Sequence, residues 1–279
     1  MSKAPARIWL CADDYGISPS VNAAIRDLIA WRRINATSVI VVAPSFQHSE
    51  AASLDALNTG TRRAAIGLHV TLTAPFKPMS KDFERARADQ FLPLPPTLVL
   101  AILHRFRIEQ IVAEITAQFA AFAAAFGRAP DFIDGHQHVH LFPQVRDAFL
   151  TVAKAKAPLA WVRQCGRVAP IAKRLAGAKG LLLDILSHGF RVRAAQLSVR
   201  TNPAFAGAYD FSPDADFAKL FSGFLDGLSD NSVVMCHPGH VDDELKRLDP
   251  LTTLREREYT YFADARFPAL LEARGITLA

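Results

Sequence analysis

The chain has 279 residues, of which 50% are apolar and 21% carry a charge. This composition excludes a disordered chain, and the length suits one α/β barrel domain of about 250 residues. A net charge of +5 falls short of a nucleic-acid-binding signature, so we expect no nucleic-acid partner. The three cysteines lack CxxC spacing, which favours a reducing, cytoplasmic setting, and no stretch approaches the roughly 20 apolar residues of a membrane span.

Short apolar runs alternate with amphipathic segments along the chain. Alternating strands and helices imply right-handed βαβ units and a mostly parallel sheet, which predicts an α/β barrel. No linker interrupts this pattern, so we expect one domain over residues 1–279. The expected strands are 7–12, 36–42, 65–71, 131–134, 160–162, 232–236 and 276–278. The expected helices follow a Ser20 cap, cover 108–126, begin at Pro143, and cover 215–228 and 260–274, and 77–96 is expected to be a long surface loop.

Six polar residues fall at or near the ends of these expected strands. The carboxyl ends of the strands of a parallel barrel meet on one face, where active sites are built. Side chains that are distant in sequence would then share one cleft. They are Asp13, Asp14, His69, His136, Arg163 and His237.

Each of these motifs also has an ordinary structural interpretation. Asp13 and Asp14 could form only an exposed turn or a helix cap, and His69 could be a hydrogen-bonded core residue. The segment DGHQHVHLFP is more informative: in an extended chain its histidines at 136, 138 and 140 point the same way. Two histidines and one carboxylate suit a divalent cation with open coordination positions.

Five motifs occur in the order found in one family of enzymes. ADDYGIS, GLHVTLT, DGHQHVHLFP, WVRQ and VVMCHPGHVDDEL together resemble the YdjC-like carbohydrate deacetylases. TNPAFAGAYDF makes the chain most similar to the hopanoid-biosynthesis branch (ChbG/HpnK). The resemblance implies a distorted TIM-like (β/α) barrel that binds a divalent cation and removes N-acetyl groups from amino sugars.

The resemblance also implies roles for individual residues. The metal ligands are Asp14, His69 and His136. Mixed nitrogen and oxygen ligation of this kind suits Mg²⁺, Zn²⁺ or another transition metal. Asp13 is the expected catalytic base, while Arg163 and His237 orient that base or act as the acid. Tyr15, His138 and His140 are expected to contact substrate.

The segment at about 167–200 could be a lid or insertion. Its apolar patch GLLLDILSHGF is surrounded by basic residues, which suits an interfacial helix near anionic lipid; a solvated helix pair packed on the barrel is the alternative. The basic residues are Lys173, Arg174, Lys179, Arg191, Arg193 and Arg200.

The expected substrate is an N-acetylated amino sugar, and a lipid-linked N-acetylglucosaminyl hopanoid is one candidate. With such a substrate the protein would contact the inner surface of the membrane peripherally. The resemblance also gives an expectation of a homodimer. Two other functions stay open: a metal-dependent sugar isomerase or lyase on the same scaffold, and a non-catalytic glycan- or lipid-binding barrel.

Overall fold

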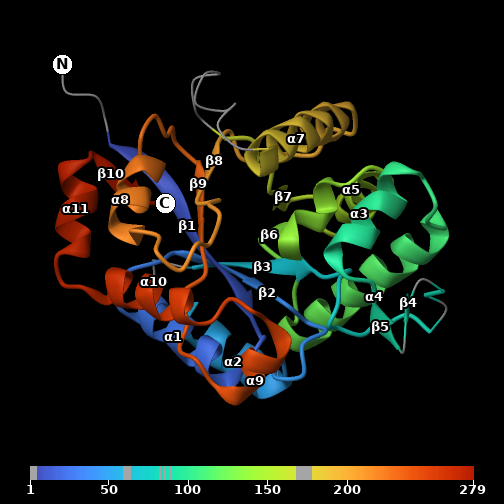
Figure 1. Cartoon of the computed structure of the whole chain (residues 1–279), viewed down its shortest axis with the longest axis horizontal. Helices are drawn as coiled ribbons and strands as arrows, with labels where there is room; N and C mark the ends of the chain where they lie inside the picture. Colours follow the sequence, from blue (N-terminus) through green and yellow to red (C-terminus); the bar gives the residue numbers. More distant parts are fainter. Residues whose placement is uncertain (1–4, 59–63, 82, 85, 88, 168–177) are drawn as a thin grey trace.

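Seven strands follow one another around a curved parallel sheet. The computed structural model in Figure 1 describes residues 5–58, 64–81, 83, 84, 86, 87, 89–167 and 178–279. The hydrogen-bonded order is β7-β6-β3-β2-β1-β9-β8, and every neighbouring pair is parallel. These strands are β1 (Ala6–Tyr15), β2 (Ala36–Val39), β3 (Ala65–Val70), β6 (Phe132–Gly135), β7 (Trp161–Val162), β8 (Phe205–Ala206) and β9 (Val233–Cys236).

The two ends of this sheet approach each other at two points. Isolated parallel bridges join Val162 to Thr201 and Arg167 to Phe205, and so connect the β7 end of the sheet to β8. The sheet therefore curls into a distorted barrel, which confirms the predicted fold class. An additional strand, β10 (Ile276–Leu278), pairs with β1, and an antiparallel pair, β4 (Ala86–Arg87) and β5 (Gln90–Phe91), stands apart from the barrel.

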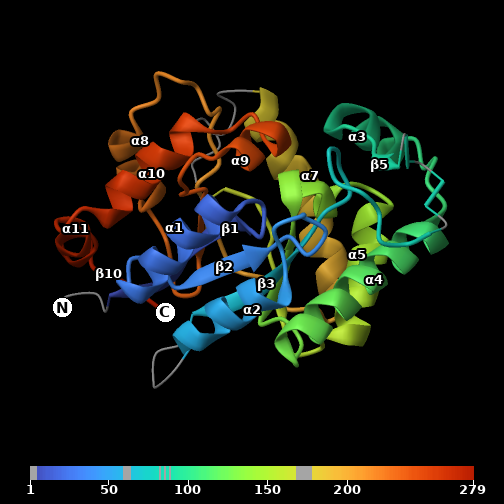
Figure 2. The same ribbon diagram turned by 90° about the horizontal axis from the view of Figure 1, so that it is seen from below.

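Helices cover the outside of the curved sheet, as the view from below in Figure 2 shows. Their bounds are α1 (Pro19–Ala30), α2 (His48–Asp55), α3 (Leu94–Ile102), α4 (Ile108–Phe126), α5 (Val145–Lys156), α7 (Ala178–Gln196), α8 (Phe217–Phe224), α9 (Asp243–Leu248), α10 (Thr253–Ala263) and α11 (Phe267–Ala273), with 3-10 turns η1 (Ala56–Asn58) and η2 (His136–Leu141). Among the described residues no helix combines the length and the apolar character needed to cross a membrane.

Local sequence signals explain where several of these helices begin and end. Ser18, two residues before the predicted cap Ser20, caps α1 by accepting a hydrogen bond from the Val21 amide, and Pro19 opens the helix. The predicted helix over 108–126 is α4, which Gly127 ends with a left-handed φ of 66°.

Three sequence-based expectations for secondary structure are wrong. The predicted helix over 260–274 is divided into α10 and α11, because Pro268 fits only the first turn of a new helix. Residues 77–96 include the β4–β5 pair and the start of α3, so they are not one long loop. Helix α5 begins at Val145, after Gln144 adopts a left-handed φ of 67°, and not at Pro143.

The expected lid at 167–200 is described only in part. Residues 168–177, including Lys173 and Arg174, lie outside the described residues. Helix α7 accounts for most of the rest and contacts η2 and α5.

Candidate metal centre and active site

Strand β1 carries two neighbouring carboxylates to the carboxyl end of the barrel. Both side chains are buried, so they do not form the exposed turn that the sequence suggested. The pairing of β1 with β2 shifts register between Ala12 and Tyr15, and Asp14 has a left-handed φ of 72°. Successive residues of a regular strand face opposite sides, and this bulge lets Asp13 and Asp14 serve two adjoining clusters.

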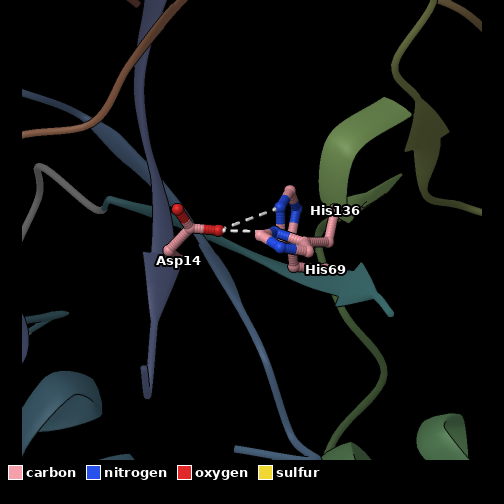
Figure 3. Close-up of side chains that lie close together, drawn as sticks. All are labelled: Asp14, His69 and His136. Atoms are coloured by element: carbon pink, nitrogen blue, oxygen red, sulfur yellow. Dashed lines mark hydrogen bonds and ion pairs between the residues drawn. The ribbon is translucent and has the colours of Figure 1, made fainter. Parts of the chain in front are cut away.

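The first cluster joins Asp14, His69 and His136, which come from β1, the end of β3 and the start of η2. Figure 3 shows one Asp14 oxygen facing both imidazoles. Asp14 Oδ1 lies 2.9 Å from His136 Nδ1 and 3.3 Å from His69 Nε2. All three side chains are buried, and their potential ligand atoms lie within 4.8 Å of one another. The structure thus brings together the three residues predicted as metal ligands.

The orientation of His69 is fixed from behind. Its Nδ1 lies 2.6 Å from Asp134 Oδ1 and 3.0 Å from Ser38 Oγ, so its Nε2 is directed at Asp14. Burial lowers the pKa of His69, but Asp134 and Asp13 outweigh this effect and raise the pKa to about 10. A carboxylate behind a histidine is the usual support for an imidazole that binds a metal.

This donor set fits a divalent cation. Atoms bonded to one Mg²⁺ or Zn²⁺ ion at about 2.1 Å stand roughly 3 Å apart, which is the spacing seen around Asp14 Oδ1. Mixed imidazole and carboxylate ligation suits either ion and does not choose between them. Asp14, His69 and His136 could therefore hold a cation with few rearrangements.

Arg255 of α10 occupies the other oxygen of Asp14. Its Nη2 lies 2.6 Å from Asp14 Oδ2 and 2.6 Å from Asp249 Oδ2, and its side chain is fully buried. Burial would raise the pKa of the Asp14 carboxyl, but Arg255 and His136 hold it well below its usual range. Asp14 is thereby kept as a carboxylate that presents a single oxygen to the two histidines.

The second cluster is an ion-pair network around Arg163, which follows β7. Arg163 Nη1 lies 2.6 Å from Asp13 Oδ2, and its Nη2 lies 2.7 Å from Asp13 Oδ1. Nη2 also lies 2.6 Å from Asp134 Oδ2 and 3.0 Å from Cys11 Sγ. Burial would raise the pKa of the Asp13 carboxyl, but Arg163 and His69 lower it below its usual range. Asp13 is thus an oriented carboxylate beside the cation site.

Cys11, Asp13 and Asp134 also form a group of potential metal ligands. The Arg163 guanidinium donates hydrogen bonds to Asp13 and Cys11 and forms an ion pair with Asp134. Burial strongly raises the pKa of the Cys11 thiol in the cation-free protein. Because the Arg163 guanidinium already contacts these donors, the group is an ion-pair cluster in this structure.

His237 stands at the end of β9, as expected for a group at the mouth of the barrel. Its backbone amide donates a hydrogen bond of 2.5 Å to Glu258, whose side chain also accepts one from Tyr209. The ring packs against Phe211, and its Nδ1 is buried without a hydrogen-bond partner among the described residues. Burial lowers the pKa of His237, so the ring is neutral near pH 7.

The three histidines of DGHQHVHLFP point in different directions, contrary to the expectation of an extended chain. Gln137 and His138 have left-handed φ angles of 54° and 58°, which turn the chain sharply after His136. His138 packs against Phe205, and burial together with Arg163 lowers its pKa to about 3. His140 is fully buried and its Nε2 lies 2.9 Å from the Arg163 backbone oxygen.

Tyr15 and His140 bond within the protein. The Tyr15 hydroxyl accepts a hydrogen bond of 2.8 Å from Arg26 and donates one of 3.0 Å to Glu50. Because both side chains are fully buried, neither is on the surface of this conformation. Substrate contact by Tyr15, His138 and His140 stays a prediction.

Three residues that hold the site residues in place were not predicted from the sequence: Asp134, Arg255 and Glu258. Asp134 stands two residues before His136, so a polar residue at the end of a buried strand could have drawn attention to it. Arg255 and Glu258 lie in the charged segment TLREREY, where nothing distinguishes them from solvent-exposed helix residues. Only the fold shows that both are buried.

A family model described as YdjC-like protein matches residues 7–273. The chain belongs to the YdjC-like family. Among solved structures, it is similar to an Enterococcus faecalis V583 protein named for a proposed role in cellobiose-phosphate cleavage, with 23% identity and a TM-score of 0.72 over 99% of this chain and 97% of that one. This similarity supports the fold.

A more distant similarity links the chain to a family 4 carbohydrate esterase from Streptomyces lividans, whose structure contains acetate. Identity is 10% and the TM-score 0.41, over 99% of this chain and 93% of that one. We draw no functional conclusion from a similarity at this level. Site geometry and membership of the YdjC-like family are the stronger guides to function.

Proposed function

We propose that this protein is a metal-dependent hydrolase that removes the N-acetyl group from an amino sugar. The proposal rests on the position of a carboxylate next to a set of potential metal ligands at the mouth of the barrel. Asp14, His69 and His136 form a ligand set, and the Asp13 carboxylate stands beside it, oriented by Arg163. Binding a cation needs only the first group, whereas hydrolysis also needs a base.

The residues divide the chemistry between them. A cation held by Asp14, His69 and His136 supplies Lewis acidity, which polarises an amide carbonyl and makes a water molecule more acidic. We assign Asp13 to accept the proton from the attacking water, because Arg163 keeps this carboxyl ionised beside the ligand set. Its two hydrogen bonds from Arg163 fix the direction from which the proton arrives.

His237 is the group we assign to the departing amine. In the free protein its ring is neutral, so the proton that Asp13 takes from the attacking water would pass to His237 before it reaches the leaving nitrogen. The hydrogen bond from its backbone amide to Glu258 holds the end of β9 in place. The products are acetate and a free amino sugar.

Within this class, we propose an N-acetylglucosaminyl substrate, and a lipid-linked one such as an N-acetylglucosaminyl hopanoid as the finer assignment. The similarity of TNPAFAGAYDF to the hopanoid-biosynthesis branch supports this choice. Soluble chito-oligosaccharides are the comparison substrates. A preference for these over lipid-linked sugars would remove the hopanoid assignment and leave the deacetylase proposal intact.

The test is acetate release by metal-stripped protein, with and without added Mg²⁺ or Zn²⁺, on soluble and lipid-linked N-acetylglucosaminyl substrates. Release that depends on the cation supports the proposal. Absence of release from every substrate, although the cation binds, would contradict it and favour an isomerase or a non-catalytic binding protein.

Asp13→Asn supplies the matched control for this assay. The amide retains the shape of the side chain but cannot accept the proton, so we expect acetate release to fall by about 10²–10⁴-fold. Titration of the same variant with cation should show binding close to that of the unmodified protein. Unchanged acetate release would remove Asp13 as the base.

A further inference from the structure

Exposed large hydrophobic side chains gather in two parts of this protein. Among the described residues eleven such side chains are exposed, and nine of them lie within 79–108 or 181–192. The other two are Trp31 and Leu159, which precede β2 and β7 and so lie toward the amino ends of the strands, away from the candidate site. Single exposed apolar side chains are normal on a protein surface, but a concentration near one end of the barrel is not.

Helix α7 is apolar on two opposite sides. Phe190 and Ala194 are buried on the side that packs onto the protein. Leu181, Ile185 and Val192 follow the spacing of a second stripe on the opposite side, and Ile185 is 60% exposed. A helix with apolar residues on both sides is expected to be covered on both, and the described chain covers only one.

Helix α3 repeats this arrangement. Thr97 and Ala101 are buried toward the protein, whereas Val99, Ile102 and Leu103 are at least half exposed. Both α3 and α7 contact η2, the turn that begins with the candidate ligand His136. Figures 1 and 2 place both helices on the opposite side of the molecule from α11. The two helices that carry the apolar stripes therefore lie beside the turn that begins with the candidate ligand His136.

The charged residues in and near α3 and α7 indicate what kind of surface could cover these stripes. From 178 to 200 the sequence has four basic residues and one acidic residue, Asp184, which pairs with Arg167 at 2.8 Å. Arg193 pairs with Asp147 at 3.0 Å, and the other basic residues are Lys179, Arg191 and Arg200. From 94 to 107 the sequence has two basic residues, Arg105 and Arg107, and no acidic residue, but Arg107 pairs with Glu84 at 2.7 Å and Glu109 follows this range. Apolar side chains with basic neighbours match the acyl and headgroup layers of an anionic membrane. A second copy that packed its α7 against this α7 would place basic residues opposite each other.

We propose that the exposed faces of α3 and α7 together form a membrane-docking surface for anionic lipid, which holds the candidate active site at the lipid headgroups. Docking would bring a lipid-linked sugar to the site without extraction from the bilayer. Binding to vesicles requires no turnover, so this inference and the proposed hydrolysis can fail separately.

The test is co-sedimentation of the full chain with vesicles of phosphatidylcholine, with and without phosphatidylglycerol. We expect binding to the anionic vesicles that weakens as salt is added. The double variants Ile185→Ser/Val192→Ser and Val99→Ser/Ile102→Ser should each bind at least about tenfold more weakly, because they remove apolar area that lipid would bury. Leu159→Ser, at a residue 84% exposed near the opposite end of the barrel, is the matched control and should bind as the unmodified protein does.

Two results would overturn the proposal. One is the absence of vesicle binding, or equal binding by the control and the two double variants. The other is a dimer in sedimentation velocity that the same double variants dissociate, since a second copy would then cover the surface. Measuring acetate release from a soluble substrate in parallel shows whether the variants have retained a folded active site.

Discussion

Two groups of potential metal ligands lie side by side in this barrel. Each group is contacted by a different buried arginine, and the two arginines leave different donor atoms free. Arg163 bonds to both oxygens of Asp13, to Asp134 and to Cys11. Arg255 bonds to only one oxygen of Asp14, and the other oxygen faces His69 and His136. A set of donor residues is therefore not enough to identify a cation site, because the position of the neighbouring guanidinium decides which donors are free.

The largest expected effect is a decrease in the free energy of unfolding when Arg163 is replaced. Arg163→Gln removes the guanidinium that pairs with the buried Asp13 and Asp134 carboxylates, which should lower the free energy of unfolding by about 3–5 kcal/mol. Denaturant unfolding of the cation-free protein measures this loss. A change below about 1 kcal/mol would show that the Arg163 network is not a tightly bonded cluster.

Arg255→Gln should lower the free energy of unfolding less than Arg163→Gln does, and the size of this decrease should depend on the presence of cation. Without cation the variant loses the partner of Asp14 and unfolds more easily, whereas added cation can neutralise Asp14 in place of the guanidinium. We therefore expect added Mg²⁺ or Zn²⁺ to raise the melting temperature of this variant more than that of the unmodified protein.

Arg255→Lys is the matched control for that comparison, because it retains the charge and should keep the smaller shift. A cation-induced shift in Arg255→Gln below that of the unmodified protein would contradict the prediction. It would mean that Arg255 acts mainly by orienting Asp14.

Asp134, which contacts His69 Nδ1, should have an intermediate effect on cation affinity. Asp134→Asn retains the shape of the side chain but removes the charge that holds His69 Nδ1, so cation affinity should fall by about 10–100-fold. Calorimetric titration of metal-stripped protein measures the change. Unaltered affinity would indicate that His69 does not bind the cation through Nε2.

The smallest effect is expected at Cys11. Cys11→Ser should leave cation affinity unchanged, because Arg163 and not a metal ion fills the space beside the thiol. The same titration provides the readout. A clearly weaker affinity would assign the cation to the group of Cys11, Asp13 and Asp134.

Much of the fold was predictable because apolar periodicity and strand-end chemistry are local signals. Uninterrupted apolar runs revealed the parallel strands, and strand-end positions placed six polar residues on one face. The family resemblance then selected Asp14, His69 and His136 among them as the ligands. The left-handed turn at Gln137 and His138 was not predictable, because nothing in HQHVH forbids an extended chain. It separates three histidines that the sequence pattern placed on one face.

The two buried arginines of the site could not be assigned their roles from the sequence, for a different reason. Arg163 stood out only by its place at a strand end and in a family motif, and Arg255 lies among other charged residues of α10. Their roles depend on burial and on partners far away in sequence, such as Asp13 and Asp14. Such long-range pairing is a property of the folded barrel and leaves no local periodicity.

The position of a bound cation tests the central claim most directly. Crystals of the protein grown with Zn²⁺ can be measured at the zinc absorption edge, where an anomalous difference map locates the ion. We predict one peak within bonding distance of Asp14, His69 and His136. A peak beside Cys11, Asp13 and Asp134, or no peak near Asp14 in protein shown to bind zinc in solution, would contradict the claim.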